Sequence, residues 1–178
     1  REQTLSPCQA IGKLLVWDGC DSAAWDKLYK VKLFKGRRYP FGVLHEDLNF
    51  TSKLFSESDK IVLTGMPLYN YLIRENSICN KPFTTQKFDI YEQAKLNCQF
   101  VRDTYKELEE KAKYFLFRCT CALLQSASDA AQISEKDLKR VKELARTQLS
   151  TAILNRFVPL GERKYYFELL YKVCIKKK

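Results

Sequence analysis

The sequence predicts an α+β protein that is predominantly α-helical, with a short two-stranded sheet followed by a helical bundle. Glycine and proline are scarce, at 6 and 5 of 178 residues, which disfavours a turn-rich all-β fold. Hydrophobic residues make up 46% of the chain, which is enough for a sizeable core. Helical periodicity runs through most of the second half, whereas strand-forming residues concentrate in two short segments of the first half.

The first half contains the mixed part of the predicted fold. Residues 4–16 carry apolar side chains at helical spacing, and residues 22–35 suggest short helical pieces. A further helical period covers residues 46–58. Next come KIVLTG and PLYNYLIR, two short segments rich in strand formers and separated at Gly65 and Pro67. We expect these two segments to form strands at the edge of a sheet.

The second half predicts helices that pack as an antiparallel bundle. Apolar residues recur alternately three and four positions apart, which predicts one helix of roughly 45–50 Å. Ser134 and Asp137 fit a capping box that starts a second helix, and a third helix follows Gly161. We therefore divide the chain into residues 1–83 and a helical bundle over residues 84–178. The residues of the apolar seam are Tyr91, Ala94, Cys98, Val101, Tyr105, Leu108, Ala112, Phe115, Cys119 and Ala122.

Net charge and cysteine content limit the kinds of partner and binding site that are expected. The formal net charge of +10 favours anionic partners, such as phosphorylated substrates or an anionic membrane face. No zinc-finger or aromatic RNA-binding signature is present, so nucleic acid is not expected as a partner. The seven cysteines include no CxxC pair, which favours free thiols over a zinc site or a disulfide framework. No apolar run approaches the ~18 residues that span a bilayer, and no signal peptide is recognisable.

The stretch FGVLHEDLNF is the most informative short motif. It contains the single histidine of the chain, His45, followed by Glu46 and Asp47 at the start of a predicted helix. One interpretation is helix capping, because carboxylates complement the positive end of the helix dipole. The other is a catalytic carboxylate that accepts a proton. The motif by itself leaves both interpretations open.

Three segments of the first half carry a family resemblance. They are AWDKLYKVKLF (24–34), YPFGVLHEDLNF (39–50) and PLYNYLIRENSI (67–78). In this order and spacing they resemble the C-terminal half of the catalytic domain of bacterial family-two glycosyltransferases. These are GT-A-fold enzymes that build capsules, lipopolysaccharide and teichoic acids. The resemblance covers about residues 1–80 and implies that residues 1–83 are the remnant of a GT-A domain.

The resemblance implies roles for individual residues. Asp47 would be the base that deprotonates the acceptor hydroxyl, with Glu46 as the neighbour that orients the acceptor or the loop. Arg74 and Ser77 would lie near the donor diphosphate, where a guanidinium can hold two phosphate oxygens.

The resemblance assigns the remaining candidates less directly. Trp25 could stack on a sugar ring and Lys27 could face phosphate, although core packing and solvation explain these two residues equally well. His45 receives no catalytic role and is expected to be a structural histidine.

The resemblance also implies a missing part. The family's Asp-x-Asp metal motif lies well before the acid pair, and the DGCD segment at 18–21 has the wrong spacing for it. Mg²⁺ or Mn²⁺ would serve the parent enzyme through ligands outside this chain, so no cofactor is expected here. We expect a truncated enzyme that transfers no sugar on its own.

The implied partners follow from the same resemblance. They are a nucleotide-sugar donor and a glycan or lipid-linked acceptor. The sequence leaves open two further partners: an anionic membrane contacted at its surface, and a second copy of the chain bound through the helices. The expected location is the cytoplasm or the inner face of the cell membrane.

Two other functional classes fit the sequence less well. The first is a non-enzymatic helical module that uses the seam to bind a partner or a second copy. The second is a hydrolase with paired carboxylates, which is disfavoured because adjacent residues on a helix cannot face one scissile bond at the usual ~5–10 Å separation. A glycosyltransferase fragment is the preferred prediction.

Overall fold

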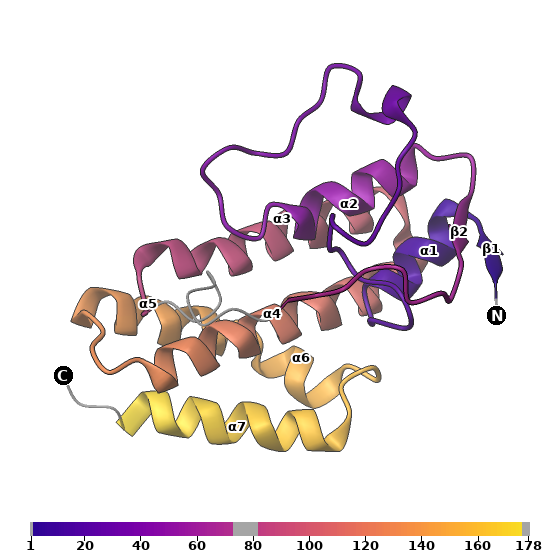
Figure 1. The fold of residues 1–178 in the computed structure, drawn as a ribbon. Coiled ribbons are helices and arrows are strands. Elements are labelled where there is room, and N and C mark those ends of the chain that lie inside the picture. Colours follow the sequence, from indigo (N-terminus) through magenta and orange to yellow (C-terminus); the bar gives the residue numbers. More distant parts are fainter. Residues whose placement is uncertain (1, 73–81, 176–178) are drawn as a thin grey trace.

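The computed structural model describes residues 2–72 and 82–175. These residues form seven α-helices and a small antiparallel sheet, which confirms the predominantly helical α+β prediction (Figure 1). The elements are β1 (Gln3–Leu5), α1 (Pro7–Leu14), α2 (Asp47–Ser56), β2 (Ile61–Leu63), α3 (Asp89–Thr104), α4 (Glu109–Asp129), α5 (Glu135–Arg146), α6 (Leu149–Leu154) and α7 (Leu160–Ile175).

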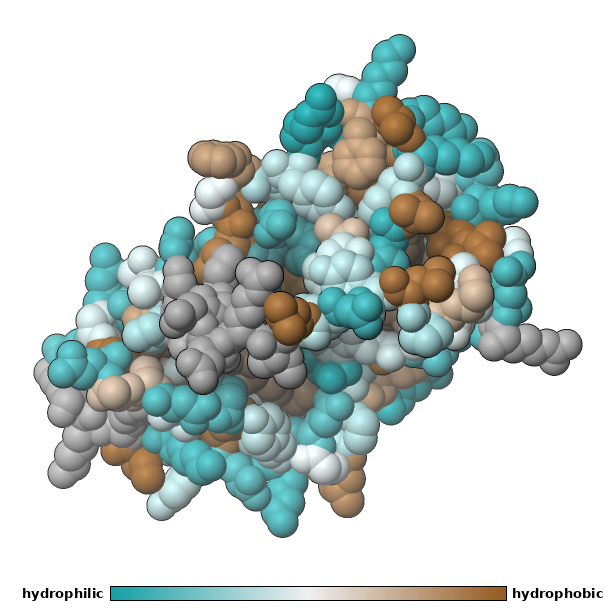
Figure 2. Space-filling view, viewed as in Figure 1, coloured by the Kyte–Doolittle hydropathy of each residue, from teal (hydrophilic) through white to brown (hydrophobic). Residues whose placement is uncertain are grey.

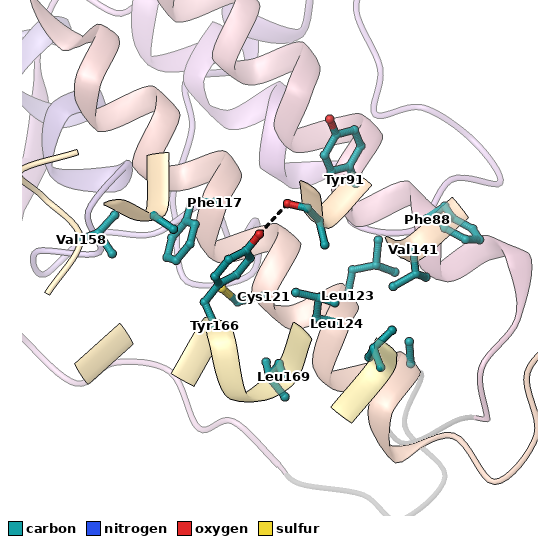
Figure 3. Close-up of a cluster of buried hydrophobic side chains, with 14 of the residues drawn as sticks. Phe88, Tyr91, Phe117, Cys121, Leu123, Leu124, Val141, Val158, Tyr166 and Leu169 are labelled. Carbon is teal, nitrogen blue, oxygen red and sulfur yellow. Dashed lines mark hydrogen bonds between the residues drawn. The ribbon is translucent and has the colours of Figure 1, made fainter. Parts of the chain in front are cut away.

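Helix α4 is the central element of the fold. It packs against α3 on one side and against α5, α6 and α7 on the other (Figure 1). In the core between α4, α5 and α7, Phe117 and Tyr166 lie with ring centroids 5.3 Å apart. The Tyr166 hydroxyl donates a hydrogen bond of 2.6 Å to the Ala145 carbonyl, so this buried polar group is satisfied (Figure 3).

A second buried cluster joins the two halves of the chain. Leu14 of α1 and Phe55 of α2 belong to the same apolar cluster as Ala94 of α3 and Phe115 of α4. The helices before residue 83 therefore bury their apolar faces against those after it. Our division into 1–83 and 84–178 stays a prediction about domains.

The prediction of one long helix along the seam was wrong. The chain leaves the helical conformation at Tyr105, with φ −133° and ψ 74°, and α4 starts at Glu109. Helices α3 and α4 pack against each other, and most of their seam residues lie in the core, whereas Ala122 is exposed. The spacing of apolar residues continues unchanged from α3 into α4, so the sequence pattern does not show the break between the two helices.

The prediction of two adjacent strands was also wrong. Strand β2 is present, but it pairs with β1, with Leu63 opposite Gln3 and Ile61 opposite Leu5. Residues 67–72 form no strand, and residues 73 and 74 lie outside the described part.

Helix starts follow their sequence signals more closely. Ser134 caps α5 by accepting a hydrogen bond of 3.1 Å from the Asp137 N–H. Ser6 and Gln9 form a complete capping box at α1, so the helix begins later than residue 4. Residues 22–35 form only a single 3₁₀ turn at Val31–Phe34. None of the helices in the described part is both long and apolar enough to cross a membrane.

Candidate functional site

The acid pair lies where two parallel helices begin. At one end of the α2–α3 interface, the Leu44 N–H donates a hydrogen bond of 2.9 Å to the Asp89 carboxylate. At the other end, the Ser56 and Tyr105 hydroxyls are 2.9 Å apart and hydrogen-bonded. The two helices therefore run in the same direction, and Asp89 fixes the backbone that leads into α2.

The backbone just before α2 adopts an unusual conformation. His45 has φ 58°, in the left-handed region that costs a residue with a Cβ roughly 1–2 kcal/mol. Its carbonyl accepts a hydrogen bond of 3.1 Å from the Leu48 N–H, so the helical turn closes directly after it. This sharp entry into the helix places Glu46 and Asp47 in the first turn of α2.

The two carboxylates of the pair have different surroundings. Glu46 stands at the cap position, yet its side chain makes no capping hydrogen bond. Burial and, to a lesser extent, the charge of the neighbouring Glu46 carboxylate raise the pKa of Asp47 to about 6. Backbone N–H groups of Asp47 and Leu48 pull the pKa down but do not outweigh burial. Asp47 therefore combines the backbone contacts of a helix cap with the raised pKa of a buried carboxylate.

The imidazole of His45 is held in its neutral form. Burial lowers the pKa of His45, and the nearby Lys87 ammonium lowers it further. The carboxylates of Glu46 and Asp89 act in the opposite direction but do not reverse the shift. A neutral imidazole here fits the structural role expected from the sequence.

A short loop lies against the face of α2 that carries Asp47. Thr51, one helical turn after Asp47, donates a buried hydrogen bond of 2.7 Å from its hydroxyl to the Ser22 carbonyl. The neighbouring Asp21 carboxylate accepts a hydrogen bond of 2.8 Å from the Ala23 N–H. The charge of Asp21 also contributes to the raised pKa of Asp47, which places the loop beside the acid pair.

The structure places Lys27 inside this loop. Its ammonium lies 3.2 Å from the Asp21 carboxylate and 2.6 Å from that of Asp26. It also donates a hydrogen bond of 2.6 Å to the Ala23 carbonyl, and only 13% of the side chain is exposed. Lys27 therefore braces the loop, with its charge balanced by two acids.

Trp25 is the centre of an exposed aromatic group. Its ring lies 4.4 Å from that of Tyr69 and 5.1 Å from that of Tyr71, measured between centroids. The three side chains are 46%, 49% and 59% exposed. The structure thus brings Trp25 together with two residues more than forty positions away, and we call this set the aromatic platform.

Two predicted site residues are not placed. Arg74 and Ser77 lie outside the described residues, so their predicted contact with a diphosphate stays a prediction. Among the described residues no group of three His, Cys, Asp or Glu side chains lies close enough to hold a metal ion.

Apolar side chains also reach the surface around the site. In Figure 2, brown residues stand among teal ones over the upper and right-hand parts of the molecule, where the loop before α2 and the chain around β2 lie in Figure 1. Leu28 and Phe41 of that loop and Leu68 after β2 are among the most exposed large apolar side chains.

Comparison with known proteins gives one partial match. The chain is similar to the glycosyltransferase GlyA of Streptococcus pneumoniae serotype 4, with 39% identity over 56 residues. Part of the chain resembles a glycosyltransferase. The matched region is 32% of this chain and 8% of that relative, so the chain spans a small part of the relative's length. No protein-family model matches the chain, and no solved structure matches it.

Sequence reasoning missed several residues around the acid pair. Asp21 and Asp89 come from distant segments, and neither stands in a recognisable motif with the pair. Tyr69 and Tyr71 were assigned only to a strand, although their alternation, with Asn70 between them, puts both rings on one side of an extended segment. That alternation was the one signal that could have marked them as a pair.

Proposed function

We propose that this chain is part of a sugar-nucleotide-dependent inverting glycosyltransferase that builds a cell-surface polysaccharide or glycoconjugate. The observation that carries the proposal is the half-buried Asp47 carboxylate, which stands at the start of α2 with its pKa raised to about 6. The partial similarity to a named glycosyltransferase supports the same class of reaction. The family-two and GT-A assignments belong to this proposal as well.

In the proposed reaction Asp47 is the general base. Its carboxylate takes the proton of the acceptor hydroxyl, and the oxygen attacks the anomeric carbon from the side opposite the nucleoside diphosphate. The bond between that carbon and the phosphate oxygen breaks, the diphosphate leaves with the electron pair, and the configuration inverts. A pKa of about 6 keeps Asp47 ionised at neutral pH while making it more basic than an ordinary carboxylate.

Neighbouring residues support this base in different ways. The Glu46 charge helps to raise the pKa of Asp47, and the bond from Leu44 to Asp89 fixes the turn that presents the pair. Arg74 and Ser77 are proposed to contact the donor diphosphate. We propose that Mg²⁺ or Mn²⁺ ligands belong to another part of the parent enzyme, and no step above depends on them.

The activity is assigned to the parent enzyme. We propose that the nucleotide-binding part of the parent enzyme, like the metal ligands, lies outside these 178 residues, and that the chain therefore transfers no sugar alone. Incubation of the purified chain with a panel of nucleotide sugars and acceptors should give no product above a boiled control. Turnover by the chain alone would contradict this part of the proposal.

Substitution of Asp47 in the parent enzyme tests the base directly. Asparagine keeps the shape but cannot accept a proton, so Asp47→Asn should lower the rate at saturating donor by about 10²–10⁴-fold. Donor affinity should survive. The matched control is Asp59→Asn, which removes a carboxylate whose side chain is 80% exposed, and it should leave the rate unchanged. Retention of more than about a tenth of the wild-type rate by Asp47→Asn falls short of a missing base and contradicts the proposal.

The alternative function, a helical interaction module, needs a different surface from the one first expected. Most of the apolar seam on α3 and α4 is buried inside this chain. Leu154 of α6 and Leu160 and Tyr171 of α7 are instead exposed. If α6 and α7 bind a second copy, light scattering should show a dimer that Tyr171→Asp dissociates; a monomer at all concentrations would reject this alternative.

A further inference from the structure

The aromatic platform of Trp25, Tyr69 and Tyr71 has the form of a binding surface rather than of a core. About half of each side chain stays in contact with water. Both tyrosine rings are tilted by 33° and 36° against the single indole. Three large rings gathered at a surface offer apolar area together with polar O–H and N–H groups at the edge.

The platform belongs to the same part of the molecule as Asp47. Trp25 stands in the loop that Thr51 holds through the Ser22 carbonyl, and Thr51 follows Asp47 by one helical turn. The ion pairs of Lys27 with Asp21 and Asp26 join the chain before Trp25 to the chain after it. The position of the indole relative to α2 is therefore fixed by hydrogen bonds and ion pairs within the chain.

The charges around the platform select against an anionic ligand. Lys27 is the cation within this loop, and it is already paired with Asp21 and Asp26, which leaves the loop with an excess of negative charge. Glu46 and Asp47 add two further carboxylates nearby. Lys27 is therefore not available to hold a phosphate at the platform, whereas a neutral ring needs no cation.

We propose that Trp25, Tyr69 and Tyr71 form the subsite for a neutral sugar ring of the acceptor. The C–H face of a pyranose packs on the aromatic rings, and its hydroxyls remain free for hydrogen bonds at the edge. This inference rests on the proposed function, because it identifies the substrate of the same site as an uncharged carbohydrate.

Binding to the 178-residue chain can be tested without any transfer reaction. Saturation-transfer NMR with methyl glycosides of glucose, galactose and N-acetylglucosamine should show contact through ring C–H protons for at least one of them. Trp25→Ala should weaken that binding by about tenfold or more, the size expected for loss of one stacking ring. Tyr71→Ala should weaken it less, and Tyr171→Ala on α7, which removes an equally exposed ring elsewhere, should have no effect.

Three results would overturn the inference. They are the absence of binding by all three glycosides, binding that Trp25→Ala and Tyr71→Ala leave unchanged, and binding of uridine diphosphate at the platform in place of the glycosides. Circular dichroism of each variant confirms that the fold is retained.

The asparagine variant keeps this test separate from that of the catalytic proposal. Asp47→Asn is assessed by transfer in the parent enzyme, whereas Trp25→Ala and Tyr71→Ala are assessed by glycoside binding to the 178-residue chain. If Asp47→Asn keeps its transfer rate while the glycoside binds at the platform, the proposed base is wrong and the subsite stands. If Asp47→Asn loses transfer but no glycoside binds at the platform, the subsite is wrong and the base stands.

Discussion

The helical bundle and the loop-rich region before it differ in how many of their large apolar side chains are buried. In the bundle, side chains such as Phe117, Leu124 and Tyr166 are fully buried around α4. In the loop-rich region, Leu28 and Phe41 stand fully exposed. Order there depends on a smaller apolar cluster, in which Leu33 packs with side chains of α2, together with specific hydrogen bonds and ion pairs. The comparison indicates that the bundle provides most of the buried core, whereas the loops and the start of α2 hold the proposed site residues in place.

A charge introduced into the buried seam should have the largest effect. Val101 is fully buried, so Val101→Asp should lower the free energy of unfolding by about 3 kcal/mol or more, through an unpaired buried carboxylate. Leu96→Asp on the same helix is the matched control, since Leu96 is 52% exposed. Urea unfolding measures both, and an unchanged midpoint for Val101→Asp would mean that the seam is not buried.

An aspartate introduced at an exposed position of the loop-rich region should have a much smaller effect on stability. Leu28→Asp should change the free energy of unfolding by less than about 0.5 kcal/mol, because this side chain is fully exposed in the folded chain. A loss as large as that of Val101→Asp would show that Leu28 is buried in solution. The two regions would then not differ in the way described.

Removal of one buried hydroxyl should have an intermediate effect. Tyr166→Phe deletes the donor to the Ala145 carbonyl and should lower the free energy of unfolding by about 1–2 kcal/mol. Tyr171→Phe, at a side chain that is 66% exposed, is the matched control and should be neutral. Equal effects of the two substitutions in urea unfolding would contradict the packing of α5 against α7.

Substitution of Asp47 should stabilise the chain slightly, and only at high pH. The raised pKa means that the protonated carboxyl favours folding below pH 3.8, and this contribution is lost as pH rises through about 6. Asp47→Asn should therefore raise the free energy of unfolding at pH 8 by about 1–2 kcal/mol, after allowance for partial exposure, and by less near pH 4. Destabilisation at pH 8 would favour the capping role instead.

The sequence predicted the parts of the fold that local signals control. Ser134 marked the start of α5, and the acid pair marked the start of α2. The break at Tyr105 was missed because no glycine or proline interrupts the seam and both helices use the same apolar spacing. The β1–β2 pairing was missed because three-residue strands leave almost no periodic signal.

The candidate site was likewise predictable from the sequence only in part. Asp47 could be found from its motif, but its burial and the approach of Asp21 depend on tertiary packing. The position of Lys27 between two acids and the two tyrosines beside Trp25 depend on how the loop folds back on α2. Contacts between distant residues of this kind have no signature in a single sequence.

The most direct test of the account is the pKa of Asp47 itself. Carbon-detected NMR of the labelled chain can follow the Asp47 carboxyl through a titration, assigned by its loss in Asp47→Asn. The account predicts a midpoint near pH 6 and a lower midpoint in Glu46→Gln, because that variant removes the neighbouring charge. A midpoint at or below the ordinary 3.8, unmoved by Glu46→Gln, would contradict the account and leave Asp47 as a helix cap.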